Sequence, residues 1–229
     1  MPSWNIHTAH AERLLAKNGA DALGICDVDA FLLGNLLPDL YVGYMVPNIS
    51  KKIKYKDTHL ASPDFVPEPR FWEFFERYGT PGPDGKVSDL VLGSWAHLVA
   101  DHDYNMRTND YLLEHGIAPG TETRIKKQSD FDLFGRTLDI SLSPHITPEV
   151  LRQCATYSPY PLGEQDIRQA QEVMEGIVRE NSENHLDETP PYLMLTDEFL
   201  SSLFEQVTNR IRAGLLAYTA GDPAWGARR

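Results

Sequence analysis

The chain has 229 residues, of which 41% are hydrophobic and 24% charged, and its formal net charge is -12. This composition is that of an ordinary globular protein and excludes a disordered or fibrous chain. The negative charge argues against non-specific binding to nucleic-acid backbones or anionic membrane surfaces, because both need a positive protein surface.

The sequence also predicts the cellular compartment of the protein. Cys26 and Cys154 are too few for a disulfide framework or a thiolate metal site. Residues 1–10 lack the basic start and apolar run of a signal peptide, and no apolar stretch approaches the roughly 20 residues that span a bilayer. We therefore expect a cytoplasmic protein without a transmembrane segment.

In the first half of the chain, helical periodicity alternates with loops. It predicts a helix over residues 5–17 that stops at Asn18-Gly19, and another over 27–37 that ends at Pro38-Asp39. Residues 41–67 carry three prolines and a run of lysines around His59. Long irregular segments of this kind are often functional or mobile. Those lysines favour a solvated loop, although they could attract a phosphate.

The rest of the chain is also predicted to be helical, with no alternating strands. Pro69–Tyr78 is an aromatic-rich helix, and Thr147-Pro148 is a good helix start. The other expected segments are helices over 90–105, 108–115, 131–140, 164–183 and 197–218, a loop over 116–125 and a loose tail over 221–229. The prediction is one all-α domain over residues 1–229, with seven to nine helices.

The segment 90–105 places a histidine and an aspartate on one side of an apolar helix. His97 and Asp101 are four residues apart, so their side chains lie one above the other. Buried polar groups need partners. A metal ion, a water cluster, or a hydrogen bond between the two residues or to backbone would each satisfy this pair.

Five polar residues stand in apolar or irregular contexts along the first half of the chain. They are His7, Asp39, His59, His97 and Asp101. Three imidazoles and two carboxylates without a thiolate suit Zn²⁺, with Mn²⁺ or Fe²⁺ as alternatives. The sequence therefore makes these five residues candidate ligands of one or two metal ions.

Four motifs within residues 5–105 carry a family resemblance. In order, they are His7 ahead of Leu14-Leu15, the LLGNLLPD that ends in Asp39, the THL around His59, and the LGSWAHLVAD of residues 92–101. This order resembles the bacterial zinc-dependent phospholipase C family, whose all-helical scaffold is shared by S1/P1-type nucleases. Residues 106–229 add little to the resemblance.

The resemblance implies both a ligand set and a reaction. The residues that match Asp39, His59, His97 and Asp101 bind one zinc in that family, and the match of His7 helps to bind a second. Asp39 would be ligand and base, and Asp101 would bridge the ions. The implied activity is hydrolysis of a soluble phosphoester or a phospholipid by metal-activated water.

The sequence also departs from the family pattern. The amino-terminal Trp that ligates zinc there corresponds to an internal Trp4, and a further ligand His is Arg107 here. The family's later H-x-x-x-E pair has one spacing match, His145 and Glu149, but a helix should begin between them. We therefore expect one or two metal ions rather than three.

Asp130 and Asp132 are alternative carboxylate donors, although cap or surface roles are more usual for such acids.

Two other functions fit parts of the sequence. His102-Asp103 is the adjacent pair of HD-type phosphohydrolases, but His102 would lie about 140° from His97 around the central helix. A non-catalytic helical protein with a structural or degenerate metal site is the other alternative. The remaining histidines are expected to be structural or on the surface; they are His10, His115 and His185.

Overall fold

The computed structural model describes residues 2–64, 66–83 and 85–228, and this part of the chain is all-α. It contains ten α-helices, one 3-10 turn (η1, Asp21–Leu23) and no strand. The helices are α1 (Trp4–Asn18), α2 (Val28–Gly34), α3 (Leu37–Leu40), α4 (Tyr55–Thr58), α5 (Phe71–Tyr78), α6 (Asp89–Glu114), α7 (Thr121–Gly135), α8 (Pro148–Ala155), α9 (Glu164–Glu183) and α10 (Asp197–Thr219). The predicted all-α class is confirmed, although the described residues form ten helices where seven to nine were expected.

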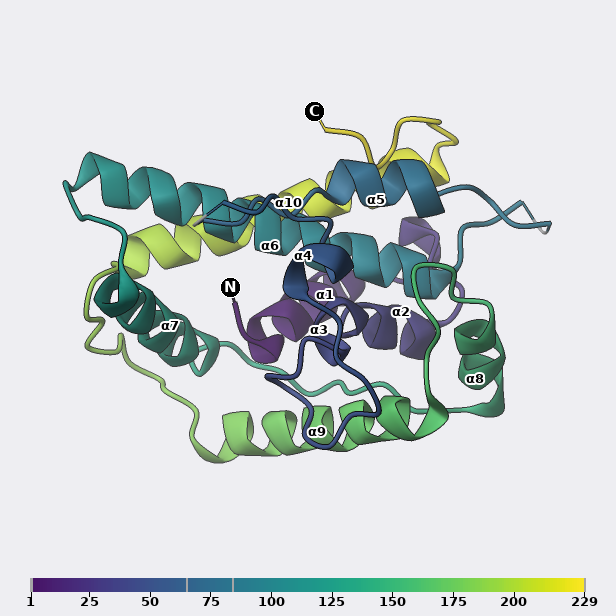
Figure 1. Cartoon of the computed structure of the whole chain (residues 1–229), viewed down its shortest axis with the longest axis horizontal. Helices are drawn as coiled ribbons and strands as arrows, with labels where there is room; N and C mark the ends of the chain where they lie inside the picture. Colours follow the sequence, from purple (N-terminus) through teal and green to yellow (C-terminus); the bar gives the residue numbers. More distant parts are fainter. Residues whose placement is uncertain (1, 65, 84, 229) are drawn as a thin grey trace.

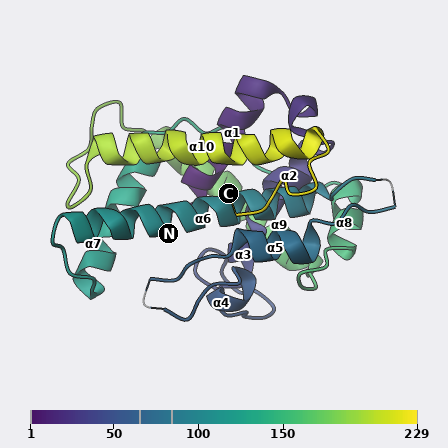
Figure 2. The ribbon, with the colours of Figure 1, turned by 90° about the horizontal axis from the view of Figure 1, so that it is seen from above.

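Helix α6 is the centre of the arrangement. It packs against α2, α5 and α10, and α10 runs antiparallel beside it (Figures 1 and 2). Helix α9 lies on the opposite side of the molecule, with α1 to α3 between (Figure 1). None of the helices in the described ranges is long and apolar enough to cross a membrane.

Two predicted boundaries were wrong. The expected helices 90–105 and 108–115 form one continuous helix of 26 residues, because Met106 and Arg107 between them are good helix formers. The expected loop 116–125 and helix 131–140 are replaced by α7, Thr121–Gly135. Helix α7 is mostly polar and only partly buried, so it lacks the apolar periodicity that predicts the other helices.

Other boundaries agree with the prediction. The Thr147 side chain accepts a hydrogen bond from the Val150 amide and so caps α8. Helix α9 spans residues 164–183 as expected. The tail was expected to be loose, but Trp225 is buried and packs edge-on against Trp95 of α6. Its aromatic contacts anchor the chain beyond α10.

The long segment between α3 and α4 is anchored by a carboxylate of α9. Asp166 accepts hydrogen bonds from the Tyr41 hydroxyl (2.9 Å) and from the amide of Ser50 (2.8 Å). The Ser50 hydroxyl adds a third. Because several donors satisfy this buried carboxylate, it joins the loop firmly to the far side of the molecule.

A close approach of two backbones fixes α2 against α6. A Cβ atom on Gly93 would lie 2.1 Å from the Phe31 carbonyl oxygen and 2.7 Å from the Asn35 amide. The Ser94 hydroxyl donates to the Gly34 carbonyl oxygen across the same contact, at 3.0 Å. The glycine therefore lets the carbonyl end of α2 reach the side of α6 that carries His97.

Gly93→Ala should destabilise the protein by about 3 kcal/mol, because the added methyl group would push backbone away from backbone. Urea denaturation monitored by circular dichroism measures the change. Gly176→Ala is the matched control, since a Cβ atom there would meet only the end of Arg179, at 4.0 Å. It should stabilise helix α9 by up to about 1 kcal/mol. Equal effects of the two substitutions would contradict the close-packing account.

Candidate metal centre

The structure brings together the five residues that the sequence singled out. His7 comes from α1, Asp39 from α3, His59 from the residue after α4, and His97 and Asp101 from α6. Each is at most 5% exposed. Four segments that are far apart in the sequence thus deliver three imidazoles and two carboxylates to one buried place.

Two overlapping sets of three residues could each hold a metal ion, namely Asp39, His59 and His97, and His7, His97 and Asp101. Further contacts join Asp101 to the first set and give a cluster of four donors. His59 Nε2 lies 3.2 Å from His97 Nε2 and 3.1 Å from Asp101 Oδ2. His97 Nε2 lies 3.7 Å from Asp101 Oδ2. Oxygens of Asp39 lie 3.6 Å from His59 Nε2 and 3.9 Å from His97 Nε2. Zinc–ligand distances of about 2.0 to 2.1 Å give tetrahedral edges of about 3.3 to 3.4 Å. The contacts of His59 with His97 and Asp101 are near this length, whereas the two Asp39 contacts come from different oxygens and are longer.

Hydrogen bonds on the far side of each ring orient two imidazoles as ligands. His97 Nδ1 is 2.8 Å from the Asn35 carbonyl oxygen, and His59 Nδ1 is 3.2 Å from the Tyr55 carbonyl oxygen. A carbonyl only accepts, so His97 Nδ1 carries hydrogen and, in the neutral ring, its Nε2 presents a lone pair. His59 Nδ1 also lies 2.8 Å from the Thr58 hydroxyl. When that hydroxyl donates to the Tyr55 carbonyl oxygen, His59 Nδ1 carries hydrogen as well and its Nε2 presents a lone pair. Two lone pairs that face each other at 3.2 Å need a proton or a cation between them.

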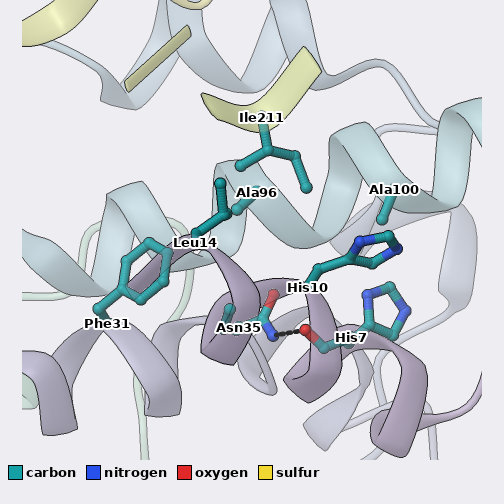
Figure 3. A pocket seen from close by; sticks show the side chains of 9 residues that line it. His7, His10, Leu14, Phe31, Asn35, Ala96, Ala100 and Ile211 are labelled. Carbon is teal, nitrogen blue, oxygen red and sulfur yellow. Dashed lines mark hydrogen bonds between the residues drawn. The ribbon is translucent and has the colours of Figure 1, made fainter. Parts of the chain in front are cut away.

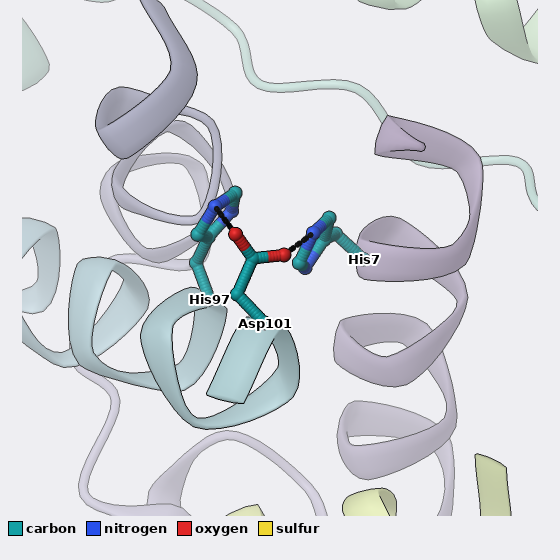
Figure 4. A group of neighbouring side chains, drawn as sticks. All are labelled: His7, His97 and Asp101. Atoms are coloured by element: carbon teal, nitrogen blue, oxygen red, sulfur yellow. Dashed lines mark ion pairs between the residues drawn. The ribbon is translucent and has the colours of Figure 1, made fainter. Parts of the chain in front are cut away.

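Asp101 stands between the two parts of the cluster, with His97 on one side and His7 on the other (Figure 4). Its Oδ2 faces His59 and His97, whereas its Oδ1 lies 3.4 Å from His7 Nε2. The His7 ring stacks on that of His97, with centroids 3.9 Å apart. The carboxylate could therefore bridge the four-donor position and a second position where His7 and Asp101 share His97 with the first.

Several buried atoms of this second position lack a hydrogen-bond partner among the described residues. They are both ring nitrogens of His7 and Oδ1 of Asp101. Buried polar atoms are rarely left unpaired, and each one costs about 1 to 3 kcal/mol. The unpaired donor atoms and the ligand chemistry fit a cation beside Asp101.

The electrostatics of the centre favour neutral His7 and ionised Asp101. Burial, together with the neighbouring His97, lowers the pKa of His7 to about 4. Burial alone would raise the pKa of Asp101, but the charge of His97 and the close imidazoles of His59 and His7 hold it well below its usual range. Burial opposes the charged form of His97, yet Asp101 outweighs it and the pKa is raised. The cluster thus holds a carboxylate among imidazoles and attracts positive charge.

Behind the centre, the helices are closely packed. His7 and His10 lie beside Leu14, Phe31 and Ile211 (Figure 3), and the space between these side chains has no room for a water molecule. The side-chain amide of Asn35 donates to the His7 carbonyl oxygen at 3.0 Å. The centre is therefore closed on this side.

The opposite side opens into a cleft. Asp39 and Tyr55 line a cavity of about 830 Å³, whose other walls include Met45, Asn105 and residues of α7. The edges that involve Asp39 are among the longest in the tetrahedral set. Asp39 is thus the ligand candidate that a molecule in the cleft would meet first.

Sequence analysis missed two residues that support the centre. The Tyr55 hydroxyl donates to Asp101 Oδ2 at 2.9 Å, and its ring stacks on His59 with centroids 3.7 Å apart. Its position four residues before His59 was the available signal. Asn35 acts through its backbone carbonyl, and no side-chain pattern reveals that role.

The structure places the adjacent pair His102-Asp103 away from the cluster. His102 Nδ1 bonds to the Pro69 carbonyl oxygen at 2.9 Å, and its ring lies edge-on between Phe71 and Trp72. Asp103 pairs with Arg210 of α10. Neither residue belongs to the metal-capable groups found in the described part of the chain.

The other candidate donors also have partners elsewhere. His145 bonds to Asp29 on the surface, and Glu149 pairs with Arg152. Asp130 accepts hydrogen bonds from the backbone amides of residues 193–195. Arg107 is exposed and Trp4 is buried in the core. None of these residues joins the five-residue centre.

Comparisons with models of protein families, with curated protein sequences and with solved structures gave no match.

Proposed function

We propose that this protein is a metal-dependent phosphoester hydrolase of the kind suggested by the resemblance to zinc-dependent phospholipase C. The observation that carries the proposal is the four-donor cluster of Asp39, His59, His97 and Asp101, with five ligand-to-ligand distances between 3.1 and 3.9 Å. The adjoining cleft gives a substrate access to one side of this cluster.

Zn²⁺ bound at this position would supply Lewis acidity, which neutralises phosphoryl charge and makes a nearby water more acidic. The protein contributes the geometry. Asn35 and Tyr55 hold the imidazoles of His97 and His59 with Nε2 towards the centre. The Tyr55 hydroxyl fixes Asp101 Oδ2.

We assign to Asp39 the role of general base, which accepts a proton from the attacking water. It lines the cleft and is 5% exposed, whereas Asp101 is 0% exposed and held among three imidazoles. A carboxylate near both substrate and metal can orient water and accept its proton. Asp101 would instead hold the centre together.

A non-catalytic protein with a structural metal site is the competing function, and the low exposure of all five residues favours it. A structural site is closed by its protein ligands, whereas a catalytic one keeps an open position. Cytoplasmic location remains a prediction, consistent with the free thiols of Cys26 and Cys154.

Asp39→Asn should lower turnover of generic phosphomonoesters and phosphodiesters by about 100-fold or more, because an amide cannot accept the proton. Initial rates on a substrate panel measure the change, and circular dichroism shows that the fold persists. Asp57→Asn, an exposed acid on α4, is the control and should leave turnover unchanged.

Chelation should abolish the wild-type activity and added Zn²⁺ should restore it. A melting temperature that falls on chelation, with no turnover at any stage, would favour the structural site instead.

A further inference from the structure

The cleft beside the metal centre has two cations on one wall. Lys127 and Arg124 of α7 line it, together with Asp39 of α3. Among the described lining residues these three are the ones that carry a formal charge at neutral pH. Tyr44, Met45 and Val66 make part of the remaining surface apolar.

Lys127 has no carboxylate partner in the described part of the chain. No Asp or Glu oxygen there lies within 4.0 Å of its ammonium group. Its neighbour Lys126 differs, because it forms an ion pair with Glu122 at 2.7 Å. A half-buried cation without a partner is costly, and such a group is often kept to bind an anion.

The Lys127 ammonium also lies within the field of the metal centre. Burial lowers its pKa, the charge of Asp101 opposes that shift, and Arg124 adds to it. Lys127 therefore interacts with Asp101 through space without contacting it. An anion in the cleft could therefore contact the α7 cations and, through Asp39, the edge of the five-residue centre.

Charge counting suggests what kind of anion fits. Asp39 and Asp101 together carry two negative charges, so one divalent ion would leave the centre neutral when its imidazoles are neutral. Lys127 and Arg124 would then give the cleft a net charge of two positive charges. A dianion matches this charge better than a monoanion does.

We propose that Lys127, with Arg124 at the rim, binds the non-bridging oxygens of a dianionic phosphate, so that the substrate class is phosphate monoesters rather than diesters. The inference rests on the proposed hydrolase function, since it places the phosphate beside the same metal centre. The apolar part of the cleft would contact the ester substituent.

The test measures the affinity of zinc-loaded protein for inorganic phosphate by calorimetry. The pH is about 8, where this anion is doubly charged. Lys127→Gln should weaken phosphate binding by about 10-fold or more, because a charge-assisted hydrogen bond is lost. Lys127→Arg should keep most of the affinity. Lys126→Gln, one residue away, should bind phosphate like the wild type.

Dimethyl phosphate, a monoanion, should bind the wild type more weakly than inorganic phosphate and should respond less to Lys127→Gln. Metal content and melting temperature are measured for every variant. Unchanged phosphate affinity in folded, zinc-loaded Lys127→Gln would overturn the inference, as would a wild type that binds no phosphate. Phosphate binding that depends on Lys127 without turnover of any ester would refute the hydrolase function and leave the anion site intact.

Discussion

His97→Ala and Asp101→Ala should each reduce the zinc content of the purified protein from about one ion per chain to nearly none. Each substitution removes a donor from a four-donor set, and such sites rarely retain an ion with fewer protein ligands when they are buried. The loss should exceed the 10- to 100-fold change in affinity that is typical of removing an outer hydrogen-bond partner. Elemental analysis after dialysis against zinc-free buffer measures the content.

His102→Ala is the matched control, because His102 is one residue from Asp101 on the same helix but bonds to the Pro69 carbonyl oxygen. It should keep the metal. If His102→Ala lost zinc and His97→Ala kept it, the adjacent His-Asp pair would be the metal site, as in HD-type phosphohydrolases. Wild-type protein without metal, even after reconstitution, would contradict the centre altogether.

Acidification from pH 6.5 to pH 4 should destabilise the metal-free protein by about 3 kcal/mol through His7 alone. The pKa of His7 is lowered from 6.5 to about 4 in the folded protein. The unfolded chain therefore takes up a proton at higher pH than the folded one. The stability that comes from a neutral His7 is complete above pH 6.5 and is lost as the pH falls through 4. His10, whose pKa burial also lowers, acts in the same direction.

Urea denaturation at several pH values, in the presence of a chelator, measures this dependence. His7→Leu should remove the His7 share of the acid sensitivity, because an apolar side chain of similar size does not titrate. His145→Leu is the control, since that side chain is 75% exposed, and it should leave the pH profile unchanged. Because the raised pKa of His97 acts in the opposite direction, the comparison between variants decides: identical wild-type and His7→Leu profiles between pH 6.5 and 4 would rule out a buried neutral His7.

Helical periodicity predicted the all-α class, and two features of the sequence predicted the five converging residues. Histidines and aspartates within apolar helices or beside prolines are uncommon, and the motif order linked them. What it could not predict was their support. The carbonyl groups of Asn35 and Tyr55 orient the imidazoles, and every residue has a carbonyl group, so side-chain identity carries no signal.

The cationic side of the cleft was also missed. Lysines near His59 were considered as a phosphate attractor, but Lys51 lies over the Tyr41 ring and bonds to the Pro161 carbonyl oxygen. The cations that line the cleft come from α7, a segment that was expected to begin as a loop. Its polar residues show helical propensity but little apolar periodicity, so tertiary position could not be inferred.

Asp130 accepts three hydrogen bonds from the backbone amides of residues 193–195. These hydrogen bonds tie α7 to the stretch that leads into α10. Helix α7 contributes none of the five converging ligand candidates, yet it forms part of the cleft wall. Substitutions on this helix could therefore change which molecules fit while every donor atom of the centre stays in place.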